Sequence, residues 1–244
     1  MIKIEKTDVY GWEAAIRGMR NPMNSWDKSD SVFFDDGEGH ICGIGEKHRG
    51  TGSLELIDIG DNDHDLMMRL AKGGSVHAKY RRMIVVTCDI AAPLYWWKEF
   101  DTYKVGTVAN SCSTMHKIHA KEFTLDDFST DRMFETDNGW IEDGRDMKYL
   151  SPLTFFEGVV CQLNCYRERF LATGDKMWWE QMIQLLPTSY NQKRTIQLNY
   201  EVLVGMYRDR KNHKLDEWHT FCDWIETLPY SELITLEGLK NENL

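Results

Sequence analysis

The sequence lacks long apolar runs: none of its 244 residues belongs to a stretch that approaches the length of a membrane-spanning helix, about 18 consecutive apolar positions. We therefore expect no membrane span. The first residues alternate apolar and charged side chains and contain neither an apolar core segment nor a small-residue cleavage site, which excludes a secretory signal peptide. Signs of disorder are also missing, because hydrophobic residues make up 42% and charged residues 28% of the chain, as in folded soluble proteins.

Positive charge is scarce. The chain has 29 basic and 39 acidic residues, for a net charge of −10. An acidic surface repels phosphate backbones, so nonspecific nucleic-acid binding is not expected to be the main function. A single nucleotide remains compatible with this composition, since it needs only one local basic pocket.

The six cysteines lack the paired spacing of a disulfide-rich domain or a zinc site. Cys161 and Cys165 fall on one face of a predicted helix without a second pair. His116 and His119 have no carboxylate or thiolate partner at convincing spacing, and the chain contains no H-E-x-x-H motif. We expect reduced thiols, a cytoplasmic protein and no metal ion.

Strands dominate the first half of the sequence and helices the second. The β-branched segment Met83–Ile90 is typical of a buried strand, and Pro93 suits the first turn of the next helix. Further strands are predicted at Ile2–Thr7 and Leu54–Ile59, and helices at 11–20, 152–172, 175–185, 190–211 and 215–227. This order indicates a mixed α/β protein with α+β-like order, a mixed sheet and a helical carboxy-terminal half, as one domain over 1–244. The polar segment 117–150 is predicted to be an excursion on the surface.

One succession of residues is more specific. It runs from the apolar strand through Ala92-Pro93-Leu94 and an aromatic helix start to Asn110-x-x-Ser113. This resembles the flavin-dependent thymidylate synthases, in which a strand leads through an A-P turn and a helix into the signature R-H-R-x-x-S-x-N-E-x-S-x-R-Y. Aligned without gaps, Asn110 and Ser113 fall on the signature's Asn and second Ser.

A second stretch extends the resemblance to about residues 54–228. The family follows a Leu-Pro with a long helix that carries N-x-R, then an Arg, and then a His before a Trp. In this sequence Leu186-Pro187 is followed by Asn199, Arg210, His213 and Trp218, in that order.

The departures concern the family's arginines. Tyr103, Lys104 and Val105 stand where the signature has R-H-R, Ser111 replaces its Glu, and Met115 its last Arg. Glu201 takes the place of the Arg in N-x-R. An arginine binds phosphate with two parallel hydrogen bonds and a permanent charge, which none of these side chains reproduces fully. Three places offer replacement cations. Lys104 lies within the signature itself, and Lys193 and Arg194 stand at a predicted helix start. Arg17 and Arg20 belong to a segment that extends to Ser25.

The resemblance implies FAD-dependent methyl transfer to dUMP, giving dTMP, with methylenetetrahydrofolate as one-carbon donor and NADPH as reductant. It also implies a homotetramer. The nine tryptophans are compatible with this assembly, because tryptophan is enriched at interfaces between subunits. The flavin carries the difficult chemistry in such enzymes, so no protein nucleophile is expected.

The same resemblance assigns candidate site residues. Those expected to bind substrate are Lys104, Ser111, Ser113, Glu201 and Arg210. Those expected to bind the cofactor are His77, Tyr103, Lys104, Asn110, Lys193 and Asn199. Asn199 and Arg210 are expected to face one pocket from the same helix.

Three alternatives stay open. The first is the same fold acting on a different pyrimidine nucleotide, for which Glu201, an acceptor-only group, would favour an amino-bearing base. The second is a non-catalytic nucleotide- or flavin-binding relative. The third is a hydrolase that uses Cys112 and His116 as a nucleophile–base pair.

Overall fold

The structure, a computed structural model, describes residues 2–33, 57–136, 139–142 and 148–236. Two compact units make up the chain, and each is described by itself. The first comprises Ala91–Phe100 and Ser111–Lys193, and the second comprises Ile2–Ile90, Asp101–Asn110 and Arg194–Leu244. The sequence-based prediction of one domain over 1–244 stays a prediction.

A four-stranded sheet has the order β1-β4-β8-β5. Its strands are β1 (Lys3–Tyr10), β4 (Val85–Pro93), β5 (Val108–Ser111) and β8 (Asn191–Asn199). In β4 the buried residues alternate with half-buried ones, as the two-residue period of a strand dictates. The boundary between the two units falls inside β4, β5 and β8.

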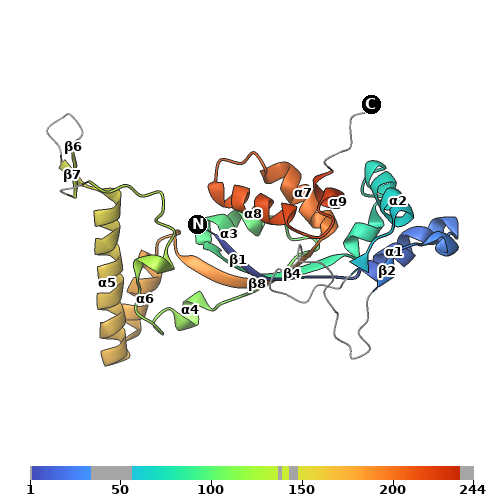
Figure 1. Cartoon of the computed structure of the whole chain (residues 1–244). Helices are drawn as coiled ribbons and strands as arrows, with labels where there is room; N and C mark the ends of the chain where they lie inside the picture. The colour runs from blue at the N-terminus through green and yellow to red at the C-terminus, as the bar shows by residue number, and fades with distance from the viewer. Residues whose placement is uncertain (1, 34–56, 137–138, 143–147, 237–244) are drawn as a thin grey trace. The chain divides into compact units, whose positions relative to one another are not determined.

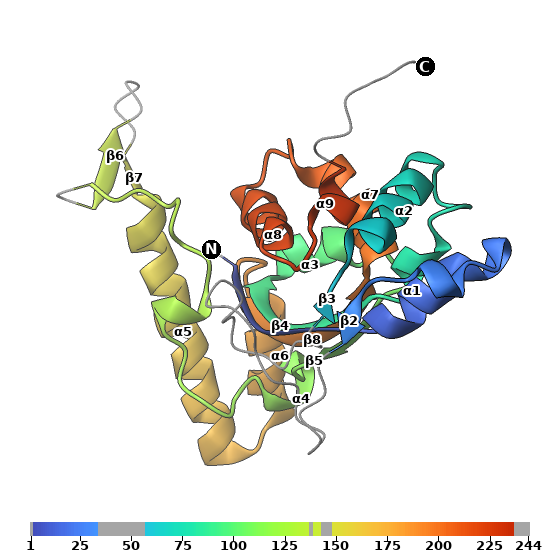
Figure 2. The same cartoon turned by 45° about the vertical axis from the view of Figure 1, so that its right-hand side comes forward.

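Helices of the second unit are α1 (Trp12–Arg20), α2 (Asp61–Lys72), α7 (Tyr200–Arg210), α8 (Asp216–Glu226) and α9 (Glu232–Thr235). Figures 1 and 2 show α7, α8 and α9 on the same side of β1 and β4. Two short strands, β2 (Val32–Phe33) and β3 (Ile57–Asp58), pair antiparallel. The short 3-10 turns of this unit are Asn21–Met23, Trp26–Lys28 and Lys79–Arg82.

The first unit is built on two packed helices, α5 (Pro152–Thr173) and α6 (Lys176–Leu185). Gly174 ends α5 with φ +68°, and the Asp175 side chain caps α6 by accepting from the Met177 N–H at 2.9 Å. The remaining elements are α3 (Leu94–Phe100), α4 (Thr114–Lys117), a 3-10 turn (Leu125–Asp127) and the antiparallel pair β6 (Trp140–Glu142) and β7 (Lys148–Leu150).

The fold class predicted from the sequence is confirmed, but the predicted helix over 190–211 is wrong in its first half. Residues 191–199 form β8, and only 200–210 form α7. In β8 the buried residues are Ile196 and Leu198, two apart, with exposed Gln197 between them. That is the period of a strand.

The predicted surface excursion over 117–150 is also partly wrong. Ile118, Phe123 and Phe128 are buried and join Phe156 and Leu163 in the core of the first unit. Four of the nine tryptophans, Trp12, Trp96, Trp97 and Trp218, are buried within the chain itself. Among the described residues, no helix is long and apolar enough to cross a membrane.

Candidate functional site

The predicted site residues divide between the two units. Ser111, Ser113 and Lys193 belong to the first unit; His77, Tyr103, Lys104, Asn110, Asn199, Glu201 and Arg210 belong to the second. Each group is therefore treated within its own unit.

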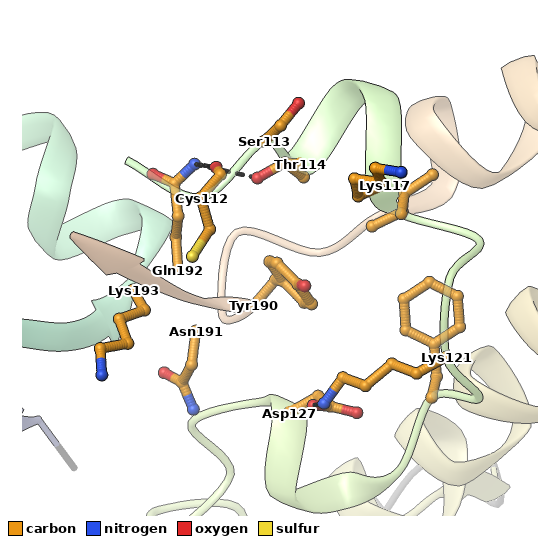
Figure 3. A pocket seen from close by; sticks show the side chains of 12 residues that line it. Cys112, Ser113, Thr114, Lys117, Lys121, Asp127, Tyr190, Asn191, Gln192 and Lys193 are labelled. Carbon is orange, nitrogen blue, oxygen red and sulfur yellow. Dashed lines mark hydrogen bonds and ion pairs between the residues drawn. The ribbon is translucent and has the colours of Figure 1, made fainter. Parts of the chain in front are cut away.

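The first unit contains a hollow of about 420 Å³. Three chain segments supply its walls, drawn from residues 112–118, 121–127 and 190–193 (Figure 3). Ligand pockets in proteins usually have volumes of about 300–1,000 Å³, so the hollow is large enough for a small organic ligand.

Hydrogen bonds fix the wall formed by the end of β5 and the start of β8. The Cys112 N–H donates to the Lys193 carbonyl at 2.9 Å. The Gln192 side-chain amide donates to the Cys112 carbonyl at 3.1 Å and to Thr114 Oγ1 at 2.9 Å. Ser113 caps α4, because its Oγ accepts from the His116 N–H at 3.2 Å. This wall is held by bonds among its own residues.

The charge in the hollow is positive. Its lining includes three lysines, Lys117, Lys121 and Lys193, and one carboxylate, Asp127, which forms an ion pair with Lys121. The hydrogen bond from Asp127 raises the pKa of Lys121. Since the whole protein carries a net charge of −10, this surplus of amines singles out the hollow as a place that favours an anion.

Tyr190 supplies an aromatic wall and lies at the centre of the hollow in Figure 3. Its ring packs edge-on against Phe128, with centroids 5.7 Å apart. Burial raises the pKa of Tyr190, and the charge of Asp127 acts in the same direction. The phenol is therefore neutral near pH 7 and presents an apolar face with a polar tip.

Among these lining residues, sequence reasoning missed Lys117, Lys121, Asp127 and Tyr190, and also Thr114 and Gln192. The first three lie in the segment that was predicted to be exposed. The sequence feature that could have identified them is the recurrence of the apolar residues Ile118, Phe123 and Phe128. These residues anchor the segment in the core, and its polar side chains are thereby held at the hollow.

In the second unit, Arg210 lies within a cluster of aromatic rings. Its Nε donates to Tyr103 Oη at 2.8 Å, and its guanidinium carbon lies 4.5 Å from the centre of the Trp218 ring and 5.4 Å from that of Tyr103. Trp218 is fully buried. A guanidinium stacked on a buried ring gains a cation–π attraction in addition to its hydrogen bonds. The structure thus joins Tyr103 and Arg210, which the sequence proposed separately.

The loop that carries Tyr103 is held at both ends. Asp101 accepts from Arg194 Nη1 at 2.6 Å, and the Thr107 hydroxyl donates to the Tyr103 carbonyl. Gly106 has φ +79°, and a Cβ there would lie 2.9 Å from Val202 Cγ2, so a larger residue is excluded. Lys104 is exposed between these fixed points, and Asn110 is exposed on β5.

Asn199 and Arg210 lie at opposite ends of α7 rather than side by side. Eleven residues at 1.5 Å per residue separate them by about 16 Å along the helix axis. Asn199 Oδ1 caps α7 by accepting from the Val202 N–H at 3.1 Å. Eleven residues are close to three full turns, so both residues lie on nearly the same face of the helix, and the expectation that they face the same pocket stays a prediction.

Glu201 already has a partner. Its carboxylate forms an ion pair at 2.9 Å with Arg81, whose side chain is 3% exposed. Arg81 also donates to the Leu233 carbonyl at 3.1 Å. One oxygen of Glu201 is thus already paired inside the protein, and the proposed preference of Glu201 for an amino-bearing base stays a prediction.

Other predicted cations are placed differently from the expectation. Lys193 and Arg194 lie on β8 and not at a helix start, so no helix amino terminus supports phosphate binding there. Arg20 is buried against Asp63 at 2.6 Å, and Arg17 pairs with Glu13 at 3.1 Å. His77 is exposed beyond α2, with its ring against Gly73.

The sheet and helices define a known fold. No protein-family model matches the chain, and no curated protein matches it in sequence. Solved structures do match: the flavin-dependent thymidylate synthase of Helicobacter pylori complexed with FAD and dUMP has a TM-score of 0.62 at 13% identity, over 96% of this chain and 98% of that chain. A second structure of the Helicobacter pylori enzyme with FAD and dUMP has a TM-score of 0.61, with the same identity and coverage.

The third similar structure is a UMP/dUMP methylase of Streptomyces cacaoi bound with 5-Br dUMP. It has a TM-score of 0.59 at 14% identity, over 97% of this chain and 95% of that chain. The resemblance predicted from Asn110, Ser113 and the later helix is thereby confirmed at the level of the fold: the chain has the fold of the flavin-dependent thymidylate synthases.

Proposed function

We propose that the chain is an enzyme that methylates dUMP to dTMP with FAD, methylenetetrahydrofolate and NADPH. The observation that carries this proposal is the amine-lined hollow of the first unit, on a fold whose solved examples bind dUMP. The proposal rests on what that hollow offers a nucleotide and on what the loop 103–110 offers a flavin.

A pyrimidine nucleotide combines a dianionic phosphate with a flat ring, and the hollow has groups for both. Lys117 and Lys193 supply positive charge, and the capping hydroxyl of Ser113 adds a polar group at the same wall. The Tyr190 ring supplies a flat apolar surface for a base. Lysines are point charges rather than bidentate forks, so several of them are needed where the family uses arginine.

The donor set of the second unit fits a flavin dinucleotide. Lys104 is an exposed cation on a fixed loop, Asn110 is an exposed amide, and the Tyr103–Arg210 pair adds a phenol and a guanidinium. We assign Lys104 to the pyrophosphate and Asn110 to the flavin or ribose, with Asn199 and His77 as further contacts and Ser111 as a contact to substrate. FAD supplies electron and one-carbon transfer when bound, while the protein side chains bind and orient.

The first test is an absorption spectrum of the purified protein, followed by identification of any released cofactor. We expect a yellow protein with flavin absorbance, or a colourless one that becomes yellow when FAD is added and the excess removed. A protein that takes up no FAD under either condition would contradict the proposal and favour the non-catalytic relative. Formation of dTMP from dUMP with methylenetetrahydrofolate and NADPH then tests the reaction itself.

A second candidate is the same chemistry on another pyrimidine nucleotide. It is favoured by the similarity to a UMP/dUMP methylase and by the replacement of the signature arginines. Thermal-shift titrations of dUMP, UMP and dCMP with FAD present would separate the candidates. A clear preference for dUMP would remove the second one. The Cys112–His116 hydrolase is tested by Cys112→Ser, which abolishes any hydrolysis if the thiol is the nucleophile.

A homotetramer and a cytoplasmic location complete the proposal and remain predictions. Light scattering of the purified protein measures the mass of the assembly directly. A monomer that binds FAD and dUMP normally would remove the tetramer without affecting the proposed reaction.

A further inference from the structure

Two cysteines lie one helical turn apart on the outer side of α5. The opposite side of the helix is buried through Phe156, Val160 and Leu163, whereas Cys161 and Cys165 are exposed and free. Side chains four residues apart are neighbours on a helix surface, with Cβ atoms about 5–6 Å apart. Both thiols therefore face solvent side by side, away from the hollow.

This spacing is wrong for a disulfide within the chain. A disulfide requires Cβ atoms about 3.5–4.5 Å apart, which an intact helix does not provide at this spacing. A bridging metal ion relaxes the requirement, because two metal–sulfur bonds of about 2.3 Å allow the sulfur atoms to lie up to about 4.6 Å apart. The regular helix thus favours chelation of a metal over oxidation of the pair.

The number of ligands selects the kind of metal. In the part of the chain that the structure describes, no group of three or more His, Cys, Asp or Glu side chains is arranged to hold a metal ion. A structural zinc site needs four ligands, and calcium and magnesium need six or more oxygens. Thiolate ligands suit Cu(I), zinc and iron–sulfur clusters, and of these Cu(I) is the soft ion of low coordination number that two thiolates can satisfy.

We propose that Cys161 and Cys165 form a two-thiolate site for a soft monovalent ion of the Cu(I) type. Binding converts two thiols and Cu(I) into a complex with two copper–sulfur bonds, and it releases two protons without change of oxidation state. The site is independent of the proposed nucleotide chemistry.

The test is an anaerobic titration of the reduced full-length protein with Cu(I), against a competing Cu(I) chelator. A background with Cys42→Ser and Cys112→Ser removes two further cysteines and leaves the buried Cys88 and Cys222. We expect one tightly bound Cu(I) per chain and release of two protons. Adding Cys161→Ser or Cys165→Ser should weaken binding roughly 10²- to 10⁴-fold, because the second sulfur then no longer binds intramolecularly.

A matched control keeps two exposed thiols but separates them. Cys165→Ser combined with Glu168→Cys places the thiols seven residues apart, about 10.5 Å along the helix, which is too far for one ion. This variant should bind as weakly as the single-thiol proteins, while circular dichroism verifies that α5 remains folded. Undiminished affinity in it, one Cu(I) per two chains, or equally tight binding of Zn(II) would each overturn the proposal.

Discussion

Three arginines of the second unit, Arg20, Arg81 and Arg210, are held by partners inside the protein, whereas the lysines around the hollow of the first unit reach towards solvent. Arg20 and Arg81 have side chains only 4% and 3% exposed, each against a carboxylate, and Arg210 is stacked on Trp218. Lys121, by contrast, is 70% exposed. A buried cation that already has a counterion stabilises the fold and has little capacity left for a ligand. The Lys121 amine is paired with Asp127 but remains exposed to solvent, so the proposed anion site in the hollow is more accessible to a ligand than the buried arginines are.

The largest effect is expected from Arg20→Met, which leaves Asp63 buried without its cation. Removing one partner of a buried ion pair typically costs about 3–5 kcal/mol in the free energy of unfolding. Urea denaturation monitored by circular dichroism measures this loss. The control is Arg17→Met, three residues earlier on α1, whose partner Glu13 is exposed and whose loss should cost under about 1 kcal/mol. Equal losses in the two variants would show that the comparison between buried and exposed cations does not hold here.

Low pH is expected to weaken the same Arg20–Asp63 ion pair and so lower the free energy of unfolding. Burial acts to raise the pKa of Asp63, but hydrogen bonds from Ser31, Ser29 and Arg20 outweigh it and hold the pKa below its ordinary value. A lowered pKa in the folded state means that the stabilisation is present above the unfolded value, about 3.9, and is lost as the pH falls below it. Urea midpoints at pH 7 and pH 3 measure the change. Asp63→Asn, although less stable throughout, should lose less between these two pH values.

An intermediate effect is expected from Tyr103→Phe, which keeps the ring and removes the oxygen that accepts from Arg210. Loss of a hydrogen bond to a charged group costs about 1.5–3 kcal/mol, and the half-exposed setting places the expected value at the lower end. If Arg210 contacts the cofactor, the Tyr103→Phe variant should also bind FAD more weakly, as measured by fluorescence quenching. Arg210→Lys offers a comparison, since lysine keeps the charge but loses the planar fork. Unchanged FAD binding in both variants would assign the cluster to stability alone.

Substitution of a lysine in the hollow is expected to have the opposite pattern of effects. The affinity for dUMP should change, whereas the free energy of unfolding should not. Lys117→Met should weaken dUMP binding roughly tenfold, about 1.4 kcal/mol, while the free energy of unfolding stays within about 0.5 kcal/mol of the parent. Isothermal titration calorimetry and urea denaturation provide the two readouts. Lys98→Met is the control, because Lys98 is exposed in the same unit but does not line the hollow. If Lys98→Met weakens binding as much, only the net charge matters and the hollow is not the site.

The smallest effect on stability is expected at the Lys121–Asp127 pair. The Lys121 side chain is 70% exposed, whereas that of Asp127 is only 10% exposed. Ion pairs made by a solvent-exposed lysine contribute about 0–1 kcal/mol, so Lys121→Met should change the urea midpoint only slightly. Asp127→Asn should cost more, because Asp127 also accepts from the Thr124 N–H at 2.9 Å in a capping box. A loss above about 2 kcal/mol for Lys121→Met would mean that this lysine is structural and would weaken the contrast with the arginines.

Residue patterns were sufficient to predict several elements. The β-branched run before Pro93 became β4, and the segments 152–172 and 175–185 correspond closely to α5 and α6. The order of Asn110, Ser113, Asn199 and Arg210 was sufficient for the fold. These predictions succeeded because a buried strand, a capped helix and a Gly or Pro break are local consequences of side-chain chemistry.

The candidate site was predicted less well, since its contacts are not local. Lys117 and Lys121 line the same hollow as Lys193, although more than seventy residues of sequence separate them from it. No local sequence pattern encodes this proximity. Likewise, nothing near Glu201 in the sequence points to Arg81, and nothing near Tyr103 indicates that it would accept a hydrogen bond from Arg210.

By itself, the sequence determined the mixed α/β class, most of the helices and the fold, because hydrophobic period and turn residues act over a few positions. Tertiary structure decided the rest. Residues 191–199 contain Gln, Lys, Arg and Leu, which suit a helix, yet they form a strand because β8 lies between β4 and β5, where backbone hydrogen bonds outweigh a weak local preference. Packing against the core also decided which cations are buried with partners and which face the hollow, since burial depends on the whole chain.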